Sequence, residues 1–179
     1  MSGKIILIIG GAKSGKTSLA MKMAKEPVTK GNGGTIVYLA TGEARDSEMK
    51  RRINIHKKSR PKNWKTIEEP IDIISAVQKE VKKKQTIILD CITLWLNNII
   101  AKKNISEDTI IKKLKTFIKV CKEGNSTIII VSNEVGLGIV PENKLARYFR
   151  DIAGNVNQII AKYADNVYLT VAGIPIKLK

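Results

Sequence analysis

The feature that most constrains this chain is the segment GGAKSGKT at residues 10–17, which directly follows the apolar run KIILII. The pattern Gly-x-x-x-x-Gly-Lys-Thr between a buried strand and a helix is typical of a phosphate-binding loop. Its glycines let backbone N–H groups point at one anion, and the following helix adds partial positive charge at its N-terminus. Lys16 can reach the terminal phosphates of a nucleoside triphosphate, and the Thr17 hydroxyl suits a bridging magnesium ion. The candidate nucleotide-binding residues here are Gly10, Gly11, Ala12, Lys13, Ser14, Gly15, Lys16 and Thr17.

Apolar runs alternate with helical patterns along the rest of the chain, which predicts an α/β fold. Short apolar runs are typical of strands buried on both faces of a parallel sheet, and we expect them at 4–9, 35–40, 86–90 and 127–132. Helical patterns cover 16–25, 46–58, 71–81, 93–101, 107–122 and 145–163. The runs 167–171 and 174–178 predict a terminal hairpin or edge strands. We therefore expect residues 1–179 to form one P-loop NTPase-like domain, with a mostly parallel central sheet flanked by helices and C-terminal strands as candidates for antiparallel pairing.

The charge of the chain restricts its partners. Thirty-two basic residues against sixteen acidic ones give a formal net charge of +16, which fits a nucleic acid or an anionic small molecule. The lysines are scattered, and aromatic residues that could stack on bases make up only 4%, so we favour the small molecule and expect no nucleic-acid partner. No apolar run is long enough to span a membrane, and no secretory leader opens the sequence, so we expect a cytoplasmic protein. Its two cysteines, Cys91 and Cys121, are expected to be reduced.

His56 is the single histidine and lies in the predicted helix 46–58. Its spacing from Met49 and Ile53 places the three on one helix face, so we expect His56 to point toward the body of the protein. That pattern alone suits a packed residue. A neutral imidazole can also attack phosphorus and hold a nucleotidyl group covalently, and nearby cations would neutralise the attacked triphosphate. The residues leave both readings open. The cations around it are Lys50, Arg51, Arg52, Lys57, Lys58, Arg60, Lys62 and Lys65.

Longer motifs follow one another in a specific order. These are GGAKSGKT, YLATG, RINIHKKSRPKNWKTIEEP, LDCITLW and SNEVGLGIVPENKLARYFRDIAGNVNQ. From about residue 4 to residue 179, the chain resembles the bifunctional adenosylcobinamide kinase and adenosylcobinamide-phosphate guanylyltransferase family of cobalamin biosynthesis. The resemblance implies that ATP or GTP phosphorylates adenosylcobinamide. GTP then gives GMP to a histidine with loss of pyrophosphate, and adenosylcobinamide phosphate takes the GMP to form adenosylcobinamide-GDP.

The resemblance also assigns residues. The guanylylated histidine of the R-I-x-x-H segment corresponds to His56, and Ile55 occupies the place where some relatives carry a second histidine. Asp90 ends the predicted strand 86–90 and, with Thr17, is the expected carboxylate for Mg²⁺, either bound directly or through water, although some relatives have glutamate in place of Asp90. Whether Glu68 and Asp90 contact guanine, ribose or metal stays open. The family implies a homotrimer, and residues 28–34 form a longer link than usual. The further GTP contacts that it implies are Ala40, Thr41, Gly42, Lys57, Lys58, Ser59, Arg60, Glu68 and Asp90.

Two other functions fit parts of the sequence. A small-molecule kinase that uses the phosphate loop alone would form no covalent nucleotide, and His56 would then be a packing residue. A nucleic-acid-binding ATPase would bind DNA or RNA with steep salt dependence. The covalent chemistry expected of His56 separates the guanylyltransferase from both alternatives.

Overall fold

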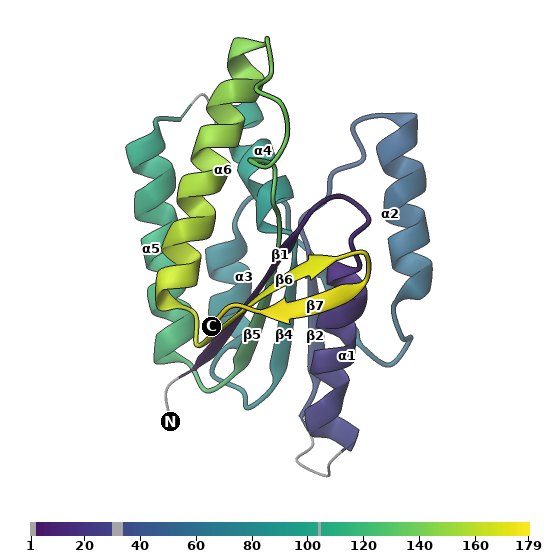
Figure 1. Cartoon of the computed structure of the whole chain (residues 1–179). Helices are drawn as coiled ribbons and strands as arrows, with labels where there is room; N and C mark the ends of the chain where they lie inside the picture. The colour runs from purple at the N-terminus through teal and green to yellow at the C-terminus, as the bar shows by residue number, and fades with distance from the viewer. Residues whose placement is uncertain (1–2, 30–33, 104) are drawn as a thin grey trace.

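The computed structural model describes residues 3–29, 34–103 and 105–179, which form a sheet covered by helices (Figure 1). In these ranges seven strands follow the order β3-β2-β4-β5-β1-β6-β7. Neighbouring strands pair in parallel except β7, which is antiparallel to β6. This confirms the α/β prediction with its antiparallel C-terminal pair. The strands are β1 (Lys4–Gly10), β2 (Ile36–Ala40), β3 (Lys65–Glu68), β4 (Thr86–Asp90), β5 (Thr127–Asn133), β6 (Asn166–Val171) and β7 (Ile174–Lys177).

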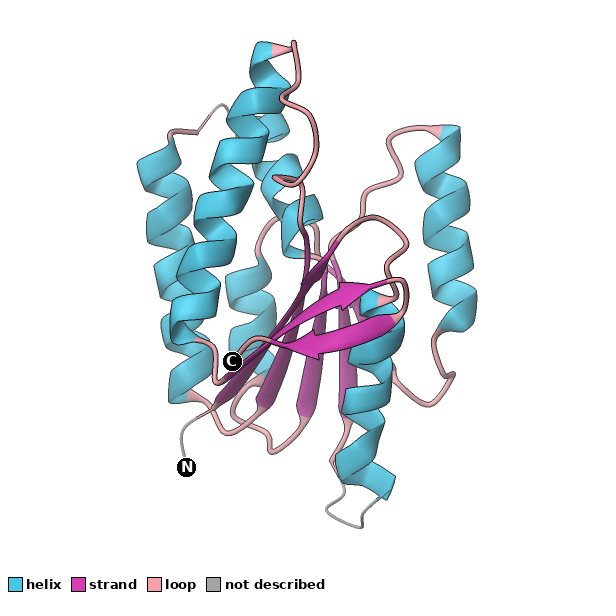
Figure 2. Cartoon of the chain, in the orientation of Figure 1, coloured by secondary structure: helices cyan, strands magenta, loops and turns pink. Residues whose placement is uncertain are grey.

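The helices lie on both faces of the sheet (Figure 2). Alternate residues of β1 face opposite sides, as the pleat of a strand requires. Ile5 and Leu7 pack in the core with α3 to α6, whereas Ile6 and Ile8 pack with Ala20 and Ala24 of α1. Within the described ranges, no helix combines the length and apolar character that a membrane crossing needs. The helices are α1 (Lys16–Thr29), α2 (Ser47–Ser59), α3 (Ile73–Glu80), α4 (Ile92–Lys103), α5 (Glu107–Glu123) and α6 (Lys144–Tyr163).

Side-chain caps explain where four of these helices begin. Asp46, Asp72, Ser106 and Asn143 each accept a hydrogen bond from the backbone N–H three residues ahead. Such a cap satisfies one of the N–H groups that has no partner inside the helix, which typically stabilises a helix by about 1 kcal/mol. At the other end of α1, the helix continues past Pro27 to Thr29. Residues 30–33 of the long link expected at 28–34 lie outside the described residues.

The edge strand β3 is the element that the sequence pattern does not predict. Its four residues, KTIE, include one partly buried residue and three exposed ones, so no apolar run marks it. It nevertheless pairs in parallel with β2, from Val37 beside Lys65 to Ala40 beside Glu68. Exposure at a sheet edge explains the polar composition, since only one side of the strand is paired. Pairing brings Glu68 to the same edge of the sheet as the other candidate site residues.

Glu80, at the end of α3, ties this edge strand to the body of the protein. Its buried carboxylate accepts hydrogen bonds from Lys65 of β3, from Lys83 and from Gln85. Burial by itself raises the pKa of Glu80, but the three donors outweigh burial and lower the pKa to about 2. A carboxyl group whose pKa is depressed by folding stabilises the protein above its unfolded pKa of about 4.3, and loses that effect as the pH falls toward 2.

We therefore expect Glu80→Gln to lower the free energy of unfolding at pH 7 by about 2 kcal/mol, because it removes hydrogen bonds to a charged acceptor. The difference from wild type should narrow between pH 5 and pH 3, as the wild-type protein progressively loses the stabilisation that the charged carboxylate supplies. Urea unfolding of both proteins across this range measures the effect. An equal difference at pH 7 and pH 3 would show that the charge of Glu80 is not the stabilising feature.

Candidate active site

The loop after β1 has the backbone conformation that its glycines permit. Gly10 and Gly15 have φ values of 156° and 94°, and Lys13 between them has φ 55°. A Cβ atom at Gly10 would collide with the carbonyl oxygen of Thr170, and one at Gly15 would lie 3.0 Å from Cα of Gly173. Any larger residue would be strained at both glycines. The loop therefore needs glycine for its curvature and for the close approach of its neighbours.

Two distant segments hold this loop in place. The N–H of Gly173, in the turn between β6 and β7, donates to the carbonyl oxygen of Ser14 at 3.0 Å. The N–H of Glu134, just after β5, donates to the carbonyl oxygen of Gly10 at 2.9 Å. In Figure 1 the C-terminal hairpin lies beside the start of α1, in agreement with these contacts. The hairpin thus helps to fix the phosphate-binding loop, a role that no sequence pattern indicates.

Lys16 is the buried cation of the loop. It is 7% exposed, and its Nζ donates to the carbonyl oxygen of Gly11 at 2.5 Å and to Oγ of Ser14 at 3.5 Å. Burial lowers the pKa of the Lys16 ammonium group, while Cys91 and Asp90 act in the opposite direction. The contacts hold the ammonium group over the curled backbone, where an anion would meet both the lysine and the N-terminus of α1.

Asp90 lies against the same loop, as the sequence predicts. The Thr17 hydroxyl donates to Oδ2 of Asp90 at 3.0 Å, although the two residues are 73 positions apart. No three His, Cys, Asp or Glu side chains among the described residues gather as a metal site. A hydroxyl and one carboxylate are nevertheless hard oxygen donors, the kind that bind Mg²⁺ together with nucleotide phosphates and water. The chemistry of this pair therefore fits the expected magnesium ion.

Tyr38 of β2 is a site residue that the sequence does not single out. Its hydroxyl donates a short hydrogen bond to Oδ2 of Asp90, the atom that also accepts from Thr17. Burial and the neighbouring carboxylate of Asp90 raise the pKa of the Tyr38 hydroxyl, so it stays protonated as a donor. The aromatic ring of Tyr38 contacts Arg60, whose guanidinium carbon lies 4.2 Å from the centre of the ring.

The carboxyl ends of neighbouring strands bring further predicted residues together. Ala40 pairs in register with both Glu68 and Asp90, so the three lie level at one edge of the sheet. Thr41 is fully buried, and its hydroxyl accepts from the N–H of Cys91 and donates to the Cys91 carbonyl. These two hydrogen bonds join the ends of β2 and β4 next to the site.

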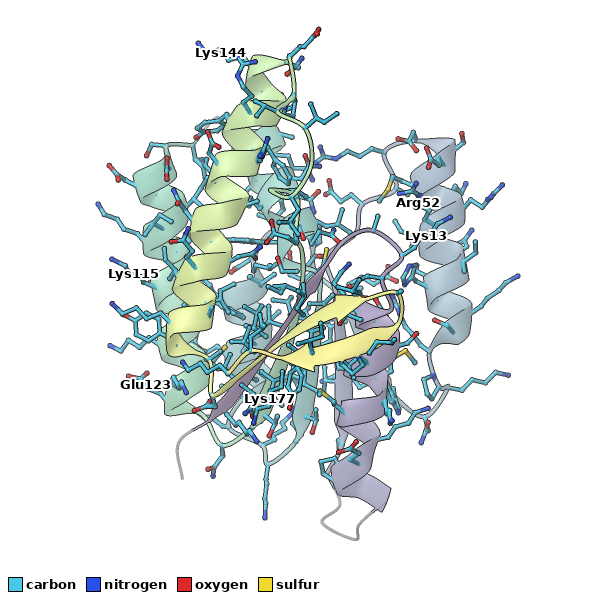
Figure 3. All side chains as sticks on the ribbon, in the orientation of Figure 1. Lys13, Arg52, Lys115, Glu123, Lys144 and Lys177 are labelled. Atoms are coloured by element: carbon cyan, nitrogen blue, oxygen red, sulfur yellow. The ribbon has the colours of Figure 1, made fainter. Side chains whose placement is uncertain are left out.

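Helix α2 carries His56, which faces the body of the protein at α1 but is exposed and not packed in the core. No residue of α2 is buried. The reason is composition, since α2 has three apolar side chains in thirteen residues, Met49, Ile53 and Ile55, too few to form a buried face. Arg52, labelled on this helix in Figure 3, is exposed and forms an ion pair with Glu48.

His56 faces helix α1 across a groove of about 480 Å³. This groove links the histidine to Thr17, the last residue of the phosphate-binding loop and the second residue of α1. It is open to solvent on one side and has lysines on its wall, so an anion could enter it. The residues that line the groove are Thr17, Ser18, Met21, Lys22, Lys25, Ile55, His56 and Ser59.

The remaining predicted residues divide between two faces of α2. Lys57 forms an ion pair with Glu68 at 2.6 Å, which joins α2 to β3. Ser59 donates to the carbonyl oxygen of His56 at 2.9 Å, and Arg60 lies on Tyr38. Lys58 lines a separate shallow groove with other residues of α2. The structure therefore brings the other three toward the site, but not Lys58.

The sheet order and the loop define a P-loop nucleotide-binding protein of the α/β class. A similar fold occurs in the flagellar accessory protein FlaH from Methanocaldococcus jannaschii, with a TM-score of 0.55 and 19% identity over 99% of this chain and 79% of that chain. Residues 6–178 match the family described as cobinamide kinase / cobinamide phosphate guanyltransferase, and the chain belongs to this family.

Curated relatives agree with this assignment. A protein from Pseudomonas aeruginosa named bifunctional adenosylcobalamin biosynthesis protein CobP is 39% identical, over 97% of this chain and 96% of its own length. Proteins named bifunctional adenosylcobalamin biosynthesis protein CobU are 37% identical in Salmonella typhimurium and 34% identical in Escherichia coli. Each of these two matches covers 98% of this chain and 99% of the relative.

Proposed function

We propose that this chain phosphorylates adenosylcobinamide with ATP or GTP and then transfers GMP from GTP to the product, through a covalent GMP–histidine intermediate on His56. The observation that carries this proposal is the groove between α1 and α2. It is lined by Thr17 at the end of the phosphate-binding loop and by the single histidine of the chain. A triphosphate held by the loop would thus have its phosphate chain close to the only imidazole in the chain, the group that could accept GMP.

The guanylyl transfer follows from this arrangement in two displacement steps. Backbone N–H groups of residues 10–17 and the Lys16 ammonium group hold the phosphates of GTP. A ring nitrogen of neutral His56 attacks the α-phosphorus, forming an N–P bond, while the bond from that phosphorus to the bridging oxygen breaks and pyrophosphate leaves. A phosphate oxygen of adenosylcobinamide phosphate then attacks the same phosphorus. The N–P bond breaks, which frees the histidine and gives adenosylcobinamide-GDP.

Magnesium and the edge of the sheet complete the proposed site. Thr17 and Asp90 would hold Mg²⁺, which supplies positive charge to the triphosphate when bound. The Ala40-Thr41-Gly42 turn and Glu68 are further proposed contacts of the nucleotide, as the family resemblance implies. Lys57 and Arg60 attach α2 to β3 and β2 by the ion pair with Glu68 and the ring contact with Tyr38. Because α2 has no buried residue, closing it over the loop would break little of the core.

The proposal is tested by supplying adenosylcobinamide, ATP, GTP and Mg²⁺ and identifying the products by mass spectrometry. We expect adenosylcobinamide phosphate first and adenosylcobinamide-GDP later. A protein that is only a kinase would stop at the phosphate. A nucleic-acid-dependent ATPase would yield neither corrinoid product, and its NTP hydrolysis would rise on addition of DNA or RNA.

We propose in addition a cytoplasmic homotrimer, as the family resemblance implies. Exposed apolar side chains after β5 support self-association, because Leu137 and Ile139 are 85% and 97% exposed and large apolar patches mark contact surfaces. Light scattering should give a mass three times the 19.8 kDa of the chain. The mass of a single chain at micromolar concentration would contradict the trimer.

A further inference from the structure

We propose that Tyr38 is a positioning residue for the magnesium–nucleotide site, fixing Asp90 through its hydroxyl and the end of α2 through its ring. The inference rests on the proposed function, in which Asp90 and Thr17 hold Mg²⁺ and α2 carries the nucleophile. The loop motif does not include Tyr38, and the inference depends on the contacts of Tyr38 with Asp90 of β4 and with Arg60, which directly follows α2.

The first contact orients the carboxylate. Oδ2 of Asp90 accepts from both the Tyr38 hydroxyl and the Thr17 hydroxyl. Two donors on one oxygen restrict rotation of the carboxyl group. The other oxygen, Oδ1, is then the one available to bind a cation. A Thr17 hydroxyl that bound a metal through its oxygen could still donate to Asp90, and Tyr38 would be the second donor that holds the carboxylate. A carboxylate fixed in advance binds a metal more tightly than one that must be ordered by it.

The second contact reaches the helix that carries His56. Arg60 directly follows α2, and its guanidinium group lies over the Tyr38 ring, while its Nε is buried without a hydrogen-bond partner among the described residues. The contact with the Tyr38 ring is one attachment of this side chain. Tyr38 itself is 1% exposed and packs in the core between the sheet and α1. A rigid residue thus touches both the metal-binding carboxylate and the end of the catalytic helix.

Tyr38→Phe keeps the ring under Arg60 and removes the hydroxyl that donates to Asp90. The measurement is the affinity for a fluorescent GDP analogue with Mg²⁺ and with EDTA, which needs no turnover. We expect wild type to bind the analogue more tightly with Mg²⁺ than with EDTA. In Tyr38→Phe the ratio of these two affinities should be roughly tenfold smaller, the scale of one hydrogen bond to a charged group. Its affinity in EDTA should equal that of wild type. Tyr163→Phe, which removes a hydroxyl at the end of α6, is the matched control and should change neither value.

The other outcomes would overturn the inference. An equal loss of affinity with and without Mg²⁺, accompanied by a lower melting temperature, would mean that Tyr38 only supports the fold. The inference also fails if Mg²⁺ raises the affinity of Tyr38→Phe for the GDP analogue as much as that of wild type. It fails as well if Mg²⁺ does not raise the affinity of wild type. If the metal effect appears but no GMP is ever found on His56, the inference stands and the guanylyltransferase proposal fails.

Discussion

Replacing His56 with alanine is expected to abolish GMP transfer to adenosylcobinamide phosphate, with a loss of at least about a thousandfold in rate. The reason is that His56 is the only imidazole in the chain, so no other residue can form the same nitrogen–phosphorus bond. Phosphorylation of adenosylcobinamide should stay close to the wild-type rate, because that step needs the loop and its metal but no covalent histidine. Parallel assays of the two products, with the same enzyme preparation, measure both effects.

The matched control for this change is Asn54→Ala. Asn54 is exposed on α2, outside the groove that His56 lines, so its variant should retain both activities. Equal loss of the two activities in His56→Ala would point to damage to α2 as a whole. Undiminished GMP transfer would show that the histidine is not the nucleophile, and would favour direct transfer from GTP to the corrinoid phosphate.

Replacing Lys16 with methionine is expected to lower both activities by roughly a hundredfold or more, the scale of removing one preorganised charge from a phosphate site. Methionine keeps much of the length of the buried side chain and removes only the ammonium group. Since one loop is proposed to serve both reactions, the two rates should fall together, in contrast to His56→Ala. Steady-state kinetics for ATP and GTP measure the change.

Lys115→Met is the control for the loss of a lysine charge. Lys115 is exposed on α5, on the far side of the sheet from α2 (Figure 3), and its removal should leave both rates unchanged. If Lys16→Met impaired only one of the two reactions, the nucleotides would have to bind at separate places. That result would contradict the single groove on which the proposed mechanism depends.

Patterns of neighbouring residues predict the parts of this fold that are determined by short segments of the chain. Runs such as KIILII and TIILD identify buried parallel strands, because both of their faces are covered by helices. The phosphate-binding loop is recognisable from the spacing of its glycines and Lys16. Asp90 is a predictable partner for Thr17, since the carboxyl ends of parallel strands meet at one edge of the sheet.

The remaining features arise from contacts between distant segments. The hydrogen bond from Gly173 to Ser14 spans most of the chain, and nothing near either residue encodes it. Strand β3 lies at an exposed edge and needs no apolar run. The helical spacing of His56 suggested an inner face, but α2 has too few apolar residues to be buried. For Tyr38, the sequence predicts a buried strand and leaves open which polar group its hydroxyl meets.

The central claim is that His56 carries GMP covalently, and incubation with GTP labelled at the α-phosphate tests it most directly. After removal of free nucleotide, wild-type protein should retain a label that is lost in acid and stable in base, the behaviour of a phosphorus–nitrogen bond. Peptide mass spectrometry should place GMP on the peptide that contains His56, and adenosylcobinamide phosphate should discharge it. No label on wild-type protein, or equal labelling of His56→Ala, would contradict the mechanism.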